Sequence, residues 1–66
     1  MKIIVNGQKK SFSDSPTLKE AVEQFSQCPL RVIAEVNGTI IKQTQWEQTT
    51  LNDNDTVELV GFVGGG

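Results

Sequence analysis

Asparagine is followed by glycine at residues 6–7 and again at 37–38, and each pair lies between short runs rich in apolar residues. Asn-Gly is among the strongest short-range signals for a β-hairpin, because both residues accept the positive φ of a tight two-residue turn. We therefore predict two hairpins, one over residues 2–12 and one over residues 31–42. The inward side chains are expected to be Ile3, Val5, Phe12, Val32, Ala34 and Val36, with Ile4, Ile33 and Glu35 outward.

Between the hairpins, the sequence TLKE predicts the start of a helix at Thr17. In such a capping box, the side chains of Thr17 and Glu20 each accept a hydrogen bond from the other residue's backbone N–H. One apolar helical stripe follows, made of Leu18, Ala21, Val22 and Phe25. We expect Pro29 to end this helix of about ten residues, because its ring cannot continue the backbone hydrogen bonds. A helix this short is marginal alone and must pack on a sheet.

The rest of the chain supplies a turn and a last strand. Residues 43–51 break the strand alternation and predict a short helical turn, with Trp46 as a core anchor. Residues 52–55, NDND, predict a polar turn, and residues 56–63 predict the final strand. The order β-β-α-β-β-turn-β predicts an α+β fold with a mixed sheet of four to five strands and one helix on one face. This is the β-grasp, or ubiquitin-like, arrangement, in which the first and last strands run parallel at the sheet centre.

Length and composition limit the possible functions. Sixty-six residues make a single domain, over 1–66, too small to enclose a large active site. Six basic residues are scattered among eight acidic ones, which argues against a nucleic-acid partner. No apolar run approaches the roughly 20 residues of a membrane span. The amino-terminal apolar run is too short for a secretion signal, so we expect a cytoplasmic protein.

Side-chain chemistry is sparse. The chain has no histidine, and its one cysteine, Cys28, excludes an internal disulfide and is expected to be a small apolar filler near a helix end. The polar turn lacks the glycine and the terminal glutamate of a calcium loop. Glu35 and Glu58 both face outward, so we do not expect a general acid/base pair. The sequence predicts neither a catalytic residue nor a metal site.

The last strand predicts a docking surface. Val57, Leu59 and Val63 share one face of this strand, while Glu58, Val60 and Phe62 share the other. If the first set packs under the helix, Val60 and Phe62 lie on the open face of the sheet, beside Ile4 and Ile33. An exposed apolar set of this kind typically marks a docking surface. The alternative is that loops or a second copy of the chain shield it.

The chain closes on Gly64, Gly65 and Gly66, expected to form a flexible tail. Glycine has no side chain, so such a tail can enter a slot too narrow for other residues. It reaches roughly 10 Å at about 3.3–3.6 Å per residue. Its terminal carboxylate, once converted by ATP to an acyl-adenylate, would accept a sulfur, nitrogen or oxygen nucleophile. The alternative is a frayed end with no function.

Three stretches carry a resemblance to a known family: VIAEVNGTII with Gln45 and Trp46 after it, LNDNDTVELV, and the terminal GFVGGG. Together, in register over the whole chain, they resemble the ThiS/MoaD group of ubiquitin-like sulfur carriers, and within it the ThiS carriers of thiamine biosynthesis. The resemblance implies that Gly66 is the modified residue and that Gly65 is its neighbour in the terminal Gly-Gly. It implies no separate role for Gly64.

The resemblance also implies partners and no bound cofactor. A ubiquitin-activating-like adenylyltransferase of the ThiF type would consume ATP to adenylate Gly66. A sulfur donor fed by a cysteine desulfurase would convert the adenylate to a thiocarboxylate, and a thiazole synthase of the ThiG type would take the sulfur. The chain would then be a carrier and cosubstrate, with no enzymatic activity of its own. Two alternatives stay open: a carrier subunit for molybdopterin synthesis, and a ubiquitin-like interaction domain or modifier.

Overall fold

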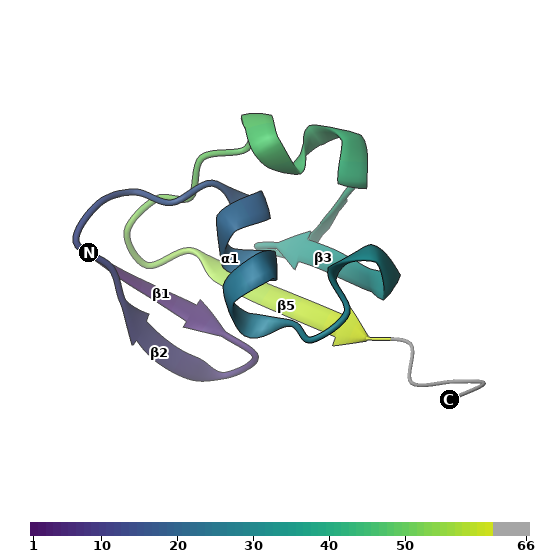
Figure 1. Ribbon diagram of the computed structural model, residues 1–66. Coiled ribbons are helices and arrows are strands. Elements are labelled where there is room, and N and C mark those ends of the chain that lie inside the picture. Colours follow the sequence, from purple (N-terminus) through teal and green to yellow (C-terminus); the bar gives the residue numbers. More distant parts are fainter. Residues whose placement is uncertain (62–66) are drawn as a thin grey trace.

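The computed structural model describes residues 1–61. Within them it contains five strands, one α-helix and two 3₁₀ turns (Figure 1). In chain order these are β1 (Lys2–Val5), β2 (Gln8–Ser11), α1 (Leu18–Phe25), η1 (Pro29–Arg31), β3 (Val32–Val36), β4 (Thr39–Ile41), η2 (Gln43–Gln48) and β5 (Thr56–Gly61). The predicted element order and α+β class are confirmed. Neither α1 nor the two turns of the described part is long and apolar enough to cross a membrane.

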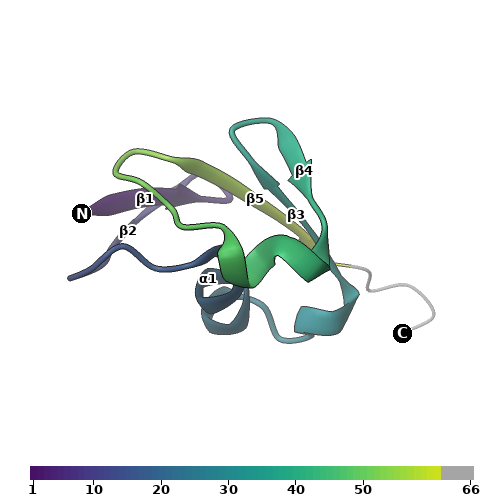
Figure 2. The same cartoon turned by 90° about the horizontal axis from the view of Figure 1, so that it is seen from above.

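All five strands form one mixed sheet in the order β2-β1-β5-β3-β4. β5 lies at the centre, parallel to β1 and antiparallel to β3, while each hairpin pairs antiparallel. Seen from above, α1 and both 3₁₀ turns lie on one side of the sheet, and no described element covers the other side (Figure 2). The predicted parallel pairing of the first and last strands is confirmed.

Both Asn-Gly pairs form the tight turns that the sequence predicts. The φ angles are 49° at Asn6 and 81° at Gly7, and 52° at Asn37 and 87° at Gly38. Positive φ at both central residues is the backbone twist that matches two antiparallel strands. The geometry of each turn is therefore set by its own two central residues.

The helix begins as predicted and ends early. Thr17 Oγ1 accepts from the Glu20 N–H at 3.1 Å, and Glu20 Oε1 accepts from the Thr17 N–H at 2.8 Å, which completes the capping box. The helix stops at Phe25, because Ser26 is already extended at φ −120° and ψ 136°. Pro29 was expected to end it, but instead occupies the first position of η1, where its missing N–H leaves no helical hydrogen bond unmade.

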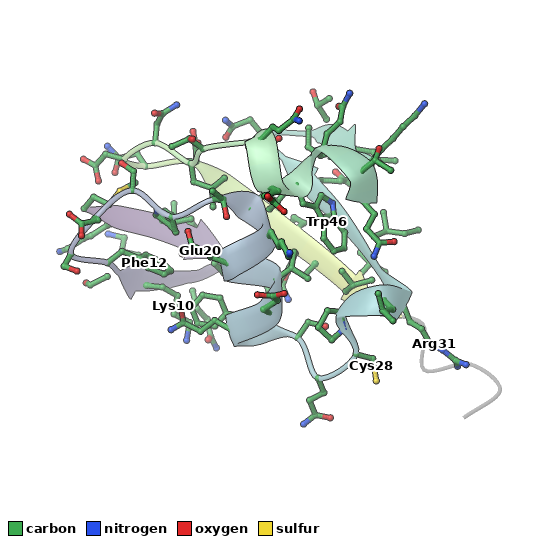
Figure 3. The ribbon with its side chains drawn as sticks, turned by 45° about the horizontal axis from the view of Figure 1, so that its top comes forward. Lys10, Phe12, Glu20, Cys28, Arg31 and Trp46 are labelled. Carbon is green, nitrogen blue, oxygen red and sulfur yellow. The ribbon has the colours of Figure 1, made fainter. Side chains whose placement is uncertain are left out.

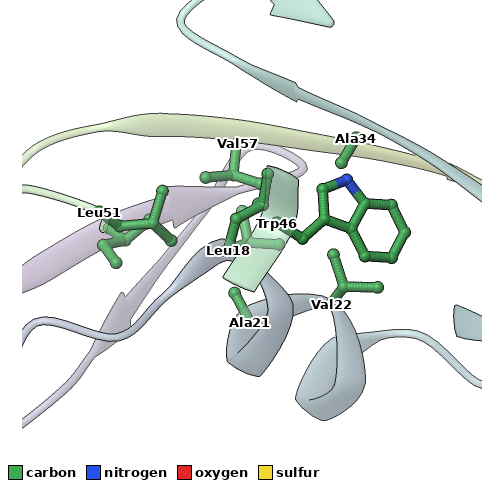
Figure 4. Packing of buried hydrophobic residues seen from close by; sticks show 9 residues of the cluster. Leu18, Ala21, Val22, Ala34, Trp46, Leu51 and Val57 are labelled. Carbon is green, nitrogen blue, oxygen red and sulfur yellow. The ribbon is translucent and has the colours of Figure 1, made fainter. Parts of the chain in front are cut away.

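The core lies between the sheet and the elements on its covered side (Figure 4). It consists of Ile3, Val5, Leu18, Ala21, Val22, Ala34, Trp46, Leu51 and Val57. Trp46 is buried, as predicted, and its indole Nε1–H donates to the Ile41 carbonyl at 3.0 Å. Burial of this large ring therefore leaves its one polar group paired.

The rim of the core at the β2 end is aromatic. Phe12 directly follows β2 and meets Phe25 edge to face, with ring centroids 5.9 Å apart. The Lys10 ammonium lies 5.5 Å from the Phe25 ring centroid on the same side (Figure 3). Phe12 therefore joins the core as predicted.

The polar turn over residues 52–55 is held by its own carboxylates. Asp53 Oδ1 accepts from the Lys2 N–H at 2.7 Å, and Asp55 Oδ2 accepts from the Asn52 N–H at 2.8 Å. Asn54 takes a positive φ of 71° at the corner. Asx side chains bond to the backbone in this way at many turns, which accounts for the composition of the segment. Within residues 1–61, no group of three or more His, Cys, Asp or Glu is placed to hold a metal ion.

Candidate functional site

The site is built on β5, the strand that leads to the end of the chain. It pairs with β1 through Ile4↔Thr56 and Val5↔Val57, and with β3 as far as Val32↔Gly61. Val57 is fully buried and Leu59 packs against the core, so both face inward as predicted. The predictions for Phe62, Val63, Gly64, Gly65 and Gly66 concern residues outside the described ones.

Asn6 holds β5 at Leu59. The β1 strand ends at Val5 and turns away, and its last backbone bond to β5 runs from the Asn6 N–H to the Val57 carbonyl at 2.9 Å. Beyond this bond, the Asn6 side chain pairs with β5: its Oδ1 accepts from the Leu59 N–H at 2.7 Å, and its Nδ2 donates to the Leu59 carbonyl at 3.3 Å. One amide thus replaces a missing strand residue and extends the pairing of β5.

Asn37 forms similar hydrogen bonds at the start of β5. Its Oδ1 accepts from the Thr56 N–H at 3.0 Å, its N–H donates to the Thr56 carbonyl at 2.8 Å, and its Nδ2 donates to Asp55 Oδ1 at 3.0 Å. The asparagines of both Asn-Gly turns therefore anchor β5, one near each end. The sequence predicts a turn at each asparagine but not these contacts, because the partner residues lie far away along the chain.

The open face of the sheet carries the apolar residues proposed for docking. Strand alternation places Ile4, Ile33 and Val60 there, and Ile33 and Val60 are directly opposite each other on β3 and β5. Val60 is 52% exposed, whereas Ile4 and Ile33 are half-buried. Docking through these residues stays a prediction.

The open face has one further exposed apolar residue, which the sequence analysis does not predict. Ile40 on β4 is 63% exposed and lies opposite Glu35 of β3. Its neighbour Ile41 packs against the core, so strand alternation points Ile40 outward. The same two-residue periodicity could have identified it. Leu30, at 81% exposed, belongs to η1 and not to the sheet.

The charges on the open face are divided between its two sides. Glu35 on β3 and Glu58 on β5 are direct cross-strand neighbours. Lys2 and Lys9 lie on the β1–β2 side of the same face, Lys9 directly opposite Ile4. Glu35 and Glu58 thus sit among the apolar residues of β3, β4 and β5, and Lys2 and Lys9 sit towards the opposite edge, while Lys42 is exposed directly after β4.

A hollow of about 350 Å³ lies where β5 ends, lined in part by Leu59, Gly61, Val32 and Cys28. Cys28 is exposed, so its prediction as a buried filler is wrong. It precedes Pro29, which disfavours helical backbone at residue 28 and leaves it in the connection between α1 and η1, at φ −130° and ψ 76°. Its side chain points away from the body of the domain (Figure 3).

Comparison with known proteins gives the same topology. A mixed sheet with its first and last strands parallel, and one helix across one face, defines a β-grasp, or ubiquitin-like, protein. The crystal structure of a thiamine biosynthesis protein (ThiS) from Geobacter metallireducens matches with a TM-score of 0.82, at 30% identity over 100% of both chains. The family model of the ThiS family matches residues 3–66. The chain belongs to the ThiS family.

Two curated relatives are longer proteins. A thiazole synthase from Paramagnetospirillum magneticum is 33% identical over 66 residues, and one from Magnetococcus marinus is 29% identical over 66 residues. Each match covers 100% of this chain and 20% of the relative. The chain therefore spans about a fifth of the length of these thiazole synthases.

Proposed function

We propose that this chain is a sulfur carrier of thiamine biosynthesis, whose Gly66 carboxylate is converted to a thiocarboxylate. The observation that carries the proposal is the ThiS family match, which runs from residue 3 through the terminal glycines to residue 66. The full-length likeness to a thiamine biosynthesis protein supports the same pathway over molybdopterin synthesis. The chain acts as a cosubstrate of its partner enzymes.

The chemistry takes place at the terminal carboxylate, in two steps. A carboxylate oxygen attacks the α-phosphorus of ATP, pyrophosphate leaves, and the terminus becomes an acyl-adenylate. A sulfur nucleophile then attacks the acyl carbon and AMP leaves, taking that oxygen with it. If the donor is a persulfide, the product is an acyl disulfide, and a thiol must reduce its S–S bond to release the thiocarboxylate.

The proposal requires three partners and no cofactor bound to the carrier. An adenylyltransferase of the ThiF type binds ATP and activates Gly66, and a donor fed by a cysteine desulfurase supplies the sulfur. A thiazole synthase of the ThiG type receives it, and the similarity to two thiazole synthases supports this last partner.

The described residues fix the position of the strand that leads to the terminus. β5 is paired on both sides and held by Asn6 and Asn37, so the chain leaves the domain from a fixed place at Gly61. Exposed Val60 lies one residue before that point, on the open face. A partner that binds this face therefore also fixes the position of Gly61 relative to itself.

Intact-mass measurement tests the proposal. The chain is incubated with ATP, a sulfur source and the activating enzyme of its own organism, and a control reaction omits ATP. We expect the mass of the chain to increase by about 16 Da only when ATP is present, since sulfur replaces one oxygen in the acyl transfer. No gain, with an enzyme shown to be active on another carrier, would refute the carrier function and leave an interaction domain.

A further inference from the structure

Two carboxylates face the same side of the sheet from directly opposed positions. Glu35 of β3 pairs with Glu58 of β5, and opposed residues in an antiparallel pair have Cβ atoms about 5 Å apart. Like charges in this arrangement destabilise a sheet. The fold therefore carries an unfavourable pair on its open face.

Neither Glu35 nor Glu58 forms a salt bridge within residues 1–61, although Lys42 is exposed directly after β4, two residues beyond Ile40. The one ion pair among residues 1–61 joins Lys19 and Glu47, on α1 and η2, across the sheet from this face. Lys2 and Lys9 share the open face, but β5 separates Lys2 from β3, and both β1 and β5 separate Lys9 from β3.

The surroundings of the pair are apolar. Strand register places Ile33 and Val60 in the next outward positions along β3 and β5, and Ile40 beside Glu35 on β4. Ile40 and Val60 are each more than half exposed. Covering these side chains with an apolar surface would also remove water from the two carboxylates, which is costly unless a cation meets them.

We propose that the open face docks onto a thiazole synthase, and that an arginine or lysine of that enzyme, set in an apolar surface, binds between Glu35 and Glu58. Arginine fits best, because its planar guanidinium can donate to two carboxylates at once. Lys2 and Lys9, on β1 and β2, meet acidic or neutral groups elsewhere in the interface. This inference rests on the proposed function.

Two thiazole synthases that resemble this chain identify the partner for the open face. Proteins with that name contain a segment similar to this whole chain within a polypeptide about five times as long. A carrier and its acceptor in one polypeptide meet at high effective concentration. Complementary charge on the docking face is a further way to raise the rate at which the two surfaces associate.

The test is binding to the thiazole synthase of the same organism, measured by isothermal titration calorimetry at low and high salt. The variant is Glu35→Gln with Glu58→Gln, which keeps the shape and removes both charges. Glu23→Gln is the matched control, since Glu23 is an exposed acid on α1, away from the open face. We expect the double variant to bind about tenfold more weakly and to lose most of its salt dependence, and the control to bind as wild type does.

Stability gives an independent readout. Removal of the like-charge pair should leave the melting temperature unchanged or raise it, so weaker binding would not reflect unfolding. Glu58→Lys should weaken binding further, because it opposes the enzyme's cation directly. Unchanged affinity and salt dependence in the double variant would overturn the inference, as would wild-type protein that does not bind the enzyme.

The two proposals can fail separately. A mass gain of about 16 Da together with charge-independent binding would overturn the docking inference and leave the carrier function intact. Charge-dependent binding without the mass gain would refute thiocarboxylate formation and support the docking surface alone.

Discussion

The side-chain amide of Asn6 pairs with the backbone of Leu59, accepting from its N–H at 2.7 Å and donating to its carbonyl at 3.3 Å. The two residues are 53 positions apart in the chain. Through this contact, the first turn of the protein stabilises the last strand just before the point where the chain leaves the domain.

Removing that amide should loosen β5. Asn6→Gly retains the positive φ of the turn and deletes both hydrogen bonds, so we expect a loss of roughly 1–2 kcal/mol in the free energy of unfolding. Asn6→Ala should cost about 1 kcal/mol more, because alanine resists left-handed backbone. Urea unfolding measures both. A glycine variant as stable as wild type would mean that water replaces the Asn6 amide without cost.

Trp46 is the largest side chain of the core. Trp46→Phe removes the Nε1–H that bonds to the Ile41 carbonyl and leaves unfilled volume, so we expect a loss of about 1–3 kcal/mol. Trp46→Ala should cost about 3–5 kcal/mol, which is enough to unfold a domain this small. Thermal unfolding followed by circular dichroism gives the comparison, with exposed Gln48→Ala as the neutral control.

Val60 tests the open face. Val60→Asp should lower kcat/KM of adenylation about tenfold, because a charge enters an apolar contact with the activating enzyme. Its melting temperature should change little, since Val60 is 52% exposed. Leu30→Asp is the matched control, being exposed on η1 and away from the sheet. Equal loss in both variants would argue against a specific docking face.

The same reasoning extends to Phe62, which the sequence places on the face of Val60. Phe62→Asp is expected to impair adenylation at nearly wild-type stability. A large drop in melting temperature would instead show that Phe62 contributes to the core.

The terminus itself can be tested by one added residue. Appending an alanine after Gly66 should abolish the gain in mass while leaving the melting temperature unchanged. The terminal carboxylate then belongs to the added alanine, and Gly66 no longer has a free carboxylate to activate. Full sulfur transfer by the extended chain would contradict a role for the free Gly66 carboxylate.

Cys28 should be dispensable for folding. Cys28→Ser is expected to change the free energy of unfolding by less than about 0.5 kcal/mol, because the thiol is exposed. The variant should also gain mass as wild type does. Loss of the gain at unchanged stability would give this thiol a part in sulfur transfer.

Local signals predicted most of the fold. The Asn-Gly turns, the Thr17–Glu20 capping box and the helical stripe each depend on residues a few positions apart, so a single sequence specifies them. The predicted end of the helix at Pro29 is wrong, because the backbone is already extended at Ser26. Nothing local marks that residue.

The site was less predictable, for the same reason. Alternation along β5 placed Val60 outward, but the opposition of Glu35 and Glu58 depends on strand register, which the sequence alone did not fix. The exposure of Cys28 depends on the path between α1 and η1. The bond from Asn6 to Leu59 joins opposite ends of the chain and has no sequence pattern to reveal it.

The parallel neighbours β1 and β5 also determine how the domain bears tension. The chain enters at the start of β1 and leaves the described fold at the end of β5, so a pull between these points acts along both strands (Figure 1). The bonds from Ile4 N to Asp55 O and from Asn6 N to Val57 O, both 2.9 Å, are then sheared together instead of being opened one after another. An enzyme that pulls on the end of this chain thus has little tendency to separate β5 from β1 one hydrogen bond at a time.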